Sequence, residues 1–159
     1  MKLYLVRHGE AVSEYEDPKR PLTENGRQEV LKVAVFLKKA DVYAHAIWHS
    51  TKLRTKQTAE IFAKTMDFKK NIEECRGLNP DDAPQFILER IVSLSLEKDS
   101  DSILIAGHLP FLPRLVSLLL TAAPSFDLLA YPTASAACLE GKGHGPWQLR
   151  WMVTPDLIP

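Results

Sequence analysis

The stretch Leu3-Tyr4-Leu5-Val6-Arg7-His8-Gly9, near the start of the chain, decides the predicted fold. Its apolar beginning is short and continuous, which is typical of a strand buried on both faces of a parallel sheet. Arg7 and His8 follow the apolar run directly. In open α/β sheets, ligands bind beyond the carboxyl ends of the strands. The stretch therefore predicts a buried first strand that ends in ionisable side chains at the edge where ligands bind.

Later segments supply further strand patterns. Residues 44–48 predict a second strand, a short piece at 72–75 is assigned to a third, and residues 102–106 form the clearest buried strand of the chain. Residues 135–139 and 147–153 predict two closing strands, joined by a loop rich in glycine.

Apolar residues at helical spacing fill the gaps between these strands. Thr23 can cap a first helix, whose buried stripe is Val30, Val33, Ala34 and Leu37. Ser50 is expected to cap a second helix, whose apolar face runs from Thr55 to Met66. A third helix is expected to bury Ile87, Ile91 and Leu94, and a fourth follows Pro110 and runs through Leu120. The alternation predicts an α/β fold, a three-layer sandwich with a mainly parallel central sheet flanked by helices.

The composition indicates one compact globular domain. A length of 159 residues fits a single domain over residues 1–159. The 20 Lys and Arg residues balance the 20 Asp and Glu residues, which argues against a protein that coats nucleic acid. A hydrophobic content of 45% and a charged content of 25% are ordinary values for such domains.

Two features concern the location of the protein. The first apolar run is too short for the core of a signal peptide, and no later run approaches the roughly 18 residues of a membrane span. Cys75 and Cys138 lie in apolar stretches without metal-ligand spacing, which favours reduced structural thiols. We therefore expect a cytoplasmic protein that binds neither membranes nor nucleic acids.

The candidate chemistry lies at three strand-to-helix junctions. The first strand ends in Arg7 and His8, the second leads through Ser50 to Arg54, and the fourth ends at His108. Since the carboxyl ends of parallel strands meet at one edge of the sheet, we expect these side chains to be neighbours. Each guanidinium can bind two oxygens in a planar fork, and the amino end of the helix after Ser50 adds positive potential. The expected ligand is a phosphate group.

His8 is the candidate nucleophile. An imidazole with one nitrogen held by a backbone carbonyl presents the other nitrogen to phosphorus, and the resulting phosphohistidine is later cleaved by water. Arg7, Arg54 and His108 are then expected to stabilise the charge on the transferring oxygens. Gly9 is expected to allow a tight turn and a close approach of the ligand to the backbone.

These motifs resemble those of a known family. Arg7-His8-Gly9-Glu10-Ala11, residues 20–26, Ser50 with Arg54 and residues 57–59, and Gly107-His108-Leu109-Pro110 are similar in order and spacing to the histidine phosphatase superfamily, which has the phosphoglycerate mutase-like fold. Within it, the short chain is most similar to SixA-type phosphohistidine phosphatases. The resemblance extends from Lys2 to about Pro113.

The resemblance implies roles for particular residues. His8 matches the nucleophile, Arg7 and Arg54 match two phosphate clamps, and His108 matches a second histidine of the phosphate pocket. Arg20 matches a recurrent basic position, for which we expect a weaker part in phosphate or substrate binding. The loop of residues 10–21 is interpreted as a substrate-facing lid, with a plain polar connection as the alternative.

The sequence departs from the family in two ways. Thr51 stands where the family usually has proline, which changes only the entry into the helix. Relatives that act on phosphoesters carry a carboxylic acid in a longer insertion after the third strand, and here only Glu74, Asp81 and Asp82 are candidates, with no motif to choose among them. The phosphorus–nitrogen bond of phosphohistidine is labile, so acid assistance is less necessary for it than for an ester. The departure favours a phosphohistidine substrate.

The expected function is that of a metal-independent phosphatase without a cofactor, which works through phospho-His8 on a phosphohistidine of a partner protein. A phosphatase for small phosphomonoesters is the enzymatic alternative. Two further alternatives are a non-catalytic phosphate-binding module and a zinc hydrolase that uses His8 and His108. The sequence supplies few ligands for zinc. His45, His49 and His144 are interpreted as structural or exposed.

Overall fold

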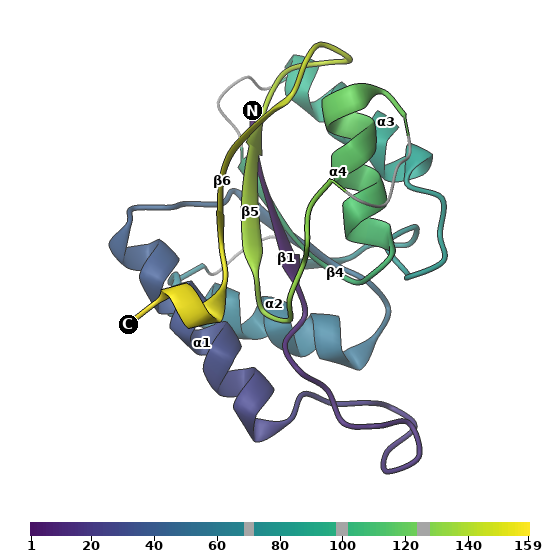
Figure 1. The fold of residues 1–159 in the computed structure, drawn as a ribbon. Coiled ribbons are helices and arrows are strands. Elements are labelled where there is room, and N and C mark those ends of the chain that lie inside the picture. Colours follow the sequence, from purple (N-terminus) through teal and green to yellow (C-terminus); the bar gives the residue numbers. More distant parts are fainter. Residues whose placement is uncertain (69–71, 98–101, 124–127) are drawn as a thin grey trace.

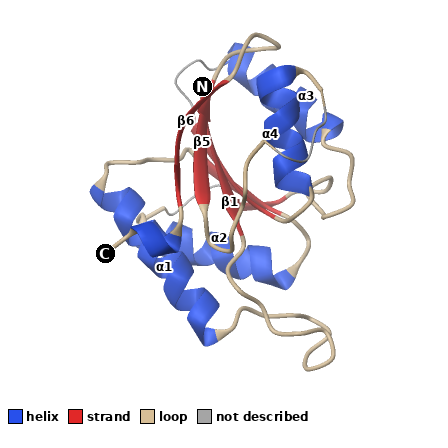
Figure 2. Ribbon diagram, viewed as in Figure 1, coloured by secondary structure: helices blue, strands red, loops and turns tan. Residues whose placement is uncertain are grey.

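The computed structural model describes residues 1–68, 72–97, 102–123 and 128–159, and it has a central sheet with helices on both faces (Figures 1 and 2). The strands are β1 (Lys2–Arg7), β2 (Ala46–His49), β3 (Ile72–Glu74), β4 (Ser102–Gly107), β5 (Ala136–Glu140) and β6 (Gln148–Val153). The helices are α1 (Glu24–Lys39), α2 (Leu53–Thr65), α3 (Gln85–Glu97), α4 (Phe111–Thr121) and the short 3-10 helix η1 (Pro155–Leu157).

The six strands form one sheet in the order β3-β2-β4-β1-β5-β6. The first four strands of this order are parallel, whereas β5 pairs antiparallel with both β1 and β6. The predicted mainly parallel three-layer sandwich is therefore confirmed, with β5 and β6 as an antiparallel extension. Because this sheet joins the first strand to the last, the topology favours our proposal of one domain over residues 1–159.

The strand β1 is buried on both faces, as its continuous apolar run predicts. Leu3 and Leu5 pack into a core on the side of α3 and α4, while Tyr4 and Val6 pack into a second core on the side of α1 and α2. Successive side chains of a strand point to opposite faces, so a strand between two helical layers needs apolar residues at every position.

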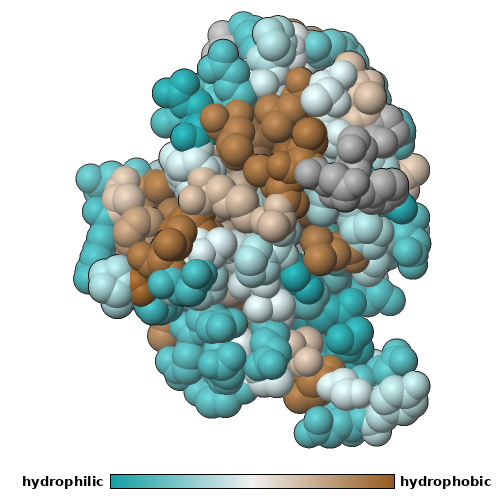
Figure 3. Space-filling view, in the orientation of Figure 1, coloured by the Kyte–Doolittle hydropathy of each residue, from teal (hydrophilic) through white to brown (hydrophobic). Residues whose placement is uncertain are grey.

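The helix α1 begins as the sequence predicts. The Thr23 side chain accepts a hydrogen bond from the Gly26 backbone N–H at 2.9 Å, and the predicted stripe from Val30 to Leu37 is buried. Helix α4 is more apolar, and most of its residues are buried. The space-filling view in Figure 3 has the orientation of Figure 1, and it shows hydrophobic surface beside the position of α4.

Some predicted details are wrong. The strand β2 begins at Ala46 rather than at residue 44. The predicted third strand is present as β3, which ends at Glu74 rather than at residue 75 and is an exposed edge strand. Leu94 and Met66 are only partly buried. Ser50 does not cap α2, because the helix begins at Leu53 and its cap position is Lys52, which makes no side-chain capping bond.

Candidate active site

The register of the sheet brings the predicted junctions together. Arg7, the last residue of β1, pairs with Gly107, the last residue of β4, so His8 and His108 follow neighbouring positions. The rings of the two histidines meet edge to face with their centroids 5.1 Å apart. Arg54 reaches the same place from the first turn of α2, and its Nε lies 3.3 Å from Nε2 of His8.

His8 is buried and held by a backbone carbonyl. Its side chain is 9% exposed, and its Nδ1 lies 2.7 Å from the Gly9 oxygen. The Gly9 carbonyl can only accept a hydrogen bond, so Nδ1 carries the proton and Nε2 carries the lone pair, which accepts from Nε–H of Arg54. This is the neutral imidazole that nucleophilic attack on phosphorus requires.

The site around His8 and His108 contains buried polar groups without a partner in the described part of the chain. One guanidinium nitrogen of Arg7 donates to the Tyr131 carbonyl at 2.6 Å, but its Nε is buried and has no partner among the described residues. Nδ1 of His108 is likewise buried and unpartnered among them. Buried polar atoms normally have partners, so these two nitrogens are available to a polar ligand.

The electrostatic surroundings are positive. The pKa of His8 is lowered from 6.5 to about 4, mainly by burial and also by the charges of Arg54, Arg7 and Arg20, while the hydrogen bond to Gly9 opposes these effects. Burial also lowers the pKa of His108 to about 2, together with His8, Arg54, Lys52 and Arg20. Both histidines are neutral at pH 7, while the guanidinium groups remain charged. Such a site attracts an oxyanion.

Packing against helix α1 requires glycine at position 9, which the sequence alone did not indicate. A Cβ built on it lies 2.5 Å from the Gly26 oxygen and 2.8 Å from a methyl of Val30, so helix α1 occupies the space. Its backbone does not have the positive φ that the structure records at Gly77 and Gly143. The glycine is required by packing against α1, and a contact of Gly9 with the ligand stays a prediction.

Arg20 lies at the end of the loop of residues 10–21, which projects from the body of the molecule in Figure 1. Its Nε donates to the Val12 carbonyl at 3.2 Å, and its backbone has a positive φ of 49°. The charge of Arg20 acts on both His8 and His108, which is consistent with the predicted weaker part in binding. Tyr15, at the tip, is 95% exposed, so the interpretation of the loop as a lid stays a prediction.

The three candidate acids do not contribute to the charges that act on the pocket histidines. Glu74 is exposed on β3, Asp81 is exposed, and a carboxylate oxygen of Asp82 accepts from the Asn79 backbone N–H at 2.8 Å. All charged groups that shift the pKa of His8 and His108 are basic residues. The structure therefore gives no reason to choose any of the three as a general acid.

The other histidines have structural partners or exposed positions. Nδ1 of His49 lies 2.8 Å from the Ser50 carbonyl, and exposed His144 lies 3.7 Å from Glu89. In the part of the chain that the structure describes, no three or more His, Cys, Asp or Glu side chains gather as metal ligands.

Cys75 and Cys138 are buried and form no disulfide bond. None of the helices in the described ranges is long and apolar enough to cross a membrane.

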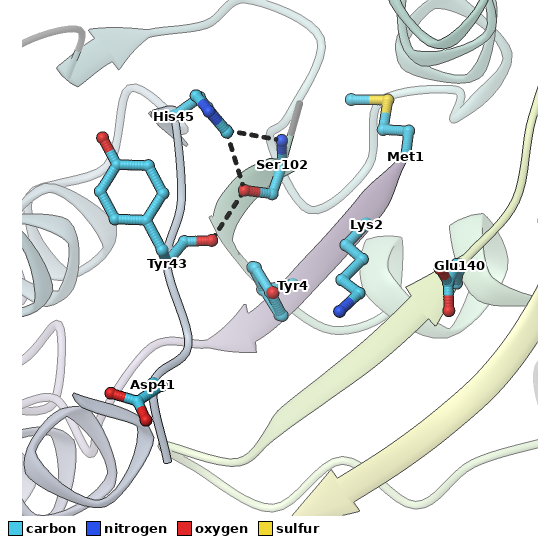
Figure 4. A pocket seen from close by; sticks show the side chains of 8 residues that line it. All are labelled: Met1, Lys2, Tyr4, Asp41, Tyr43, His45, Ser102 and Glu140. Carbon is cyan, nitrogen blue, oxygen red and sulfur yellow. Dashed lines mark hydrogen bonds between the residues drawn. The ribbon is translucent and has the colours of Figure 1, made fainter. Parts of the chain in front are cut away.

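A separate cavity of about 330 Å³ lies at the opposite ends of the parallel strands (Figure 4). Its lining includes His45 and Ser102, whose side chains lie 3.1 Å apart, and the Ser102 hydroxyl donates to the Tyr43 carbonyl. None of the four predicted pocket residues lines it. Since α/β sheets bind ligands at the carboxyl ends of their strands, this cavity is not the candidate site.

Sequence reasoning missed one side chain of the site and one segment. Ser50 was expected to cap a helix, but its Oγ lies 2.6 Å from Nε2 of His108. Its position directly after a strand was the available signal. The segment from Tyr131 to Ser135 receives hydrogen bonds from Arg7 through backbone carbonyls, for which the sequence has no signal.

Comparisons with known proteins agree with this geometry. The model of the histidine phosphatase superfamily (branch 1) matches residues 3–79. Phosphohistidine phosphatase SixA of Escherichia coli (strain K12) is 28% identical over 156 residues, which cover 98% of this chain and 94% of that protein.

Solved structures match over the whole chain. The structure described as the protein histidine phosphatase SixA complexed with tungstate superimposes with a TM-score of 0.89 at 25% identity, and the match covers 100% of both chains. Phosphoglycerate mutase from Bacillus anthracis gives a TM-score of 0.75 at 14% identity, over 94% of this chain and 91% of that one, which concerns the fold alone. Family model, curated relative and fold all point to the histidine phosphatase superfamily: the family model matches residues 3–79, and the similarity to SixA, which extends over nearly the whole chain, supports a phosphatase.

Proposed function

We propose that the chain removes phosphate from phosphohistidine on a partner protein, with His8 as the nucleophile. In this proposal Arg7 and Arg54 clamp the phosphate, His108 stabilises its oxygens, and Arg20 contributes weaker attraction. The reaction needs no metal ion and no other cofactor, and we propose that the protein works in the cytoplasm.

The observation that carries the choice of substrate is the sign of the charges around the pocket. The charged groups that act on His8 and His108 are basic, and no carboxylate of the described residues is among them. Hydrolysis of an ester expels an alkoxide, which needs a proton from a general acid. Imidazole leaves as a stable neutral base once it is protonated, so a phosphohistidine suits a pocket without a carboxylic acid.

The proposed reaction has two displacements at phosphorus. Nε2 of His8 attacks, the bond between phosphorus and the substrate imidazole breaks, and that nitrogen keeps the electron pair and takes a proton from water. Water then attacks phospho-His8 and loses a proton to solvent, and the bond to Nε2 breaks. Inorganic phosphate leaves and His8 returns to its neutral form.

Two comparisons support the proposal. The curated relative is named a phosphohistidine phosphatase, and the relative of known structure binds tungstate, a tetrahedral oxyanion like phosphate. A protein substrate accords with a positive rim, since exposed Lys52 and partly exposed Arg20 both act on the pocket.

The test measures phosphate release from a phosphohistidine-bearing protein domain and from small phosphomonoesters such as sugar phosphates. We expect faster release from phosphohistidine, an acid-labile radiolabel on the wild-type chain after rapid quenching, and loss of both in His8→Ala. His144→Ala serves as the matched control, because His144 is exposed.

Each alternative predicts a different result. Faster release from the small esters would identify a phosphomonoesterase. Binding of the phosphorylated domain without turnover or label would identify a non-catalytic phosphate-binding module. Full hydrolytic activity in His8→Ala would overturn the mechanism.

A further inference from the structure

His108 has one ring nitrogen with a partner and one without. The residue is 1% exposed, and its Nε2 lies 2.6 Å from the Ser50 hydroxyl. Its Nδ1 is buried and has no partner among the described residues. Leaving a buried polar nitrogen unpaired costs free energy, which a ligand in the pocket can recover.

The neutral ring of His108 carries a single proton, so one nitrogen donates and the other accepts. A phosphate oxygen accepts hydrogen bonds, and it is repelled by a bare lone pair on Nδ1. For His108 to stabilise phosphate through Nδ1, the proton has to reside there, and Nε2 then needs a donor. The hydroxyl of Ser50 is the group within reach.

The surroundings of Ser50 allow its hydroxyl either to accept or to donate. Its Oγ accepts from the Lys52 backbone N–H at 3.2 Å and lies 2.8 Å from the Thr55 hydroxyl. In one arrangement, Nε2–H donates to Ser50, Ser50 donates to Thr55, and Thr55 donates to the Lys52 carbonyl at 2.8 Å. In the other, Thr55 donates to Ser50 and Ser50 donates to Nε2.

The second arrangement leaves no described carbonyl without a partner. When the Thr55 hydroxyl turns away, the Lys52 carbonyl keeps hydrogen bonds from the backbone N–H groups of Thr55 at 3.1 Å and Lys56 at 3.2 Å. The Ser50 carbonyl, to which the Thr55 hydroxyl also donates at 3.3 Å, keeps its contact with Nδ1 of His49 at 2.8 Å. The change therefore leaves both carbonyls paired, and the negative charge of a phosphate group favours it.

We propose that Ser50 is a positioning residue that donates to Nε2 of His108 when phosphate fills the pocket, which presents Nδ1–H to a phosphate oxygen. Thr55 supports Ser50 by donating to it. The inference rests on the proposed function, because it requires phosphate to bind beside His8 and His108.

The decisive test uses the unmodified protein. Nitrogen NMR of ¹⁵N-histidine-labelled chain, saturated with inorganic phosphate, distinguishes protonated from bare ring nitrogens. We expect phosphate to shift the signals of His8 and His108, with Nδ1 of His108 protonated and Nε2 bare. A protonated Nε2 in that complex overturns the role of Ser50 while leaving the proposed function intact. If inorganic phosphate shifts the signals of neither histidine, the proposed function itself is overturned.

Variants give a second measurement. Ser50→Ala is expected to lower kcat about ten-fold with a smaller change in KM, since one well-placed hydrogen bond is worth roughly that factor. Thr55→Val is expected to give a smaller loss in the same direction. Ser95→Ala is the matched control, because Ser95 is equally buried and donates to the Val92 carbonyl in α3. Equal kcat in Ser50→Ala and Ser95→Ala would contradict the proposal.

Discussion

At the scale of single residues, burial determines the protonation of the pocket histidines. The pKa of His8 falls from 6.5 to about 4 and that of His108 to about 2, with burial as the main cause. Between pH 6.5 and 4 an unfolded chain binds protons at these positions that the folded chain does not bind. Stability therefore falls as the pH falls through this window, and the contribution of His8 levels off below about pH 4.

This linkage predicts the behaviour of a His8→Gln variant. Its free energy of unfolding is expected to decrease less between pH 6.5 and 4.5 than that of the wild type, with a difference of up to about 1.4 kcal/mol per pH unit. Denaturant unfolding at a series of pH values measures it. His144→Gln is the control and is expected to follow the wild type, because His144 is exposed. Identical slopes for His8→Gln and wild type would show that His8 is not buried in its neutral form.

Arg54 is expected to act through its shape as well as its charge. Arg54→Lys keeps a cation but removes the planar fork and the Nε–H that points at Nε2 of His8. The expected loss in kcat/KM is on the order of 100-fold, as for the removal of other well-placed transition-state donors. Steady-state kinetics with a phosphohistidine protein measures it, with Arg150→Lys on the exposed face of β6 as the control. A loss below about two-fold would indicate that the fork makes no contact with the phosphate.

At the scale of elements, the close approach of α1 to the end of β1 shapes the site. A Cβ on Gly26 lies 2.2 Å from the Glu10 oxygen and 2.7 Å from its nitrogen, so alanine has no room there. The segment that has to move follows His8 and Gly9 directly. Helix packing and nucleophile position are therefore linked.

Gly26→Ala tests this link. Alanine in a helix normally gains up to about 1 kcal/mol over glycine, but here we expect a loss of stability of a few kcal/mol and reduced kcat. Thermal unfolding and kinetics measure both effects. Lys32→Ala, exposed on the same helix, is the control and is expected to change stability by less than about 0.5 kcal/mol. A more stable Gly26→Ala would show that the helix can shift without cost.

At the scale of the whole molecule, three elements deliver positive charge to one edge of the sheet although the chain has no net charge. A pocket flanked by Arg7, Arg54 and Arg20 disfavours a metal cation. Phosphatase activity is therefore expected to survive dialysis against EDTA, and added Zn²⁺ is expected not to raise it. Loss with EDTA and recovery with Zn²⁺ would instead support a zinc hydrolase.

Much of the fold and the site could be predicted from local pattern. The apolar run before Arg7, the cap at Thr23 and the buried strand before His108 each depend on neighbouring residues, and each is confirmed. The wrong expectation for Ser50, and the packing reason for Gly9 that the sequence did not indicate, concern contacts with distant parts of the chain. The packing of α1 against the first junction, which involves Gly26, has no signal in the local sequence.

The sequence by itself determined the order of strands and helices and the residues that end the strands, because hydrophobic periodicity and capping act over a few residues. Only the tertiary structure decided the strand register that places His8 beside His108, the packing that requires Gly9, and the hydrogen bond of Ser50 to His108. These depend on distances between residues far apart in the chain, which are set when the sheet and its two helical layers pack together.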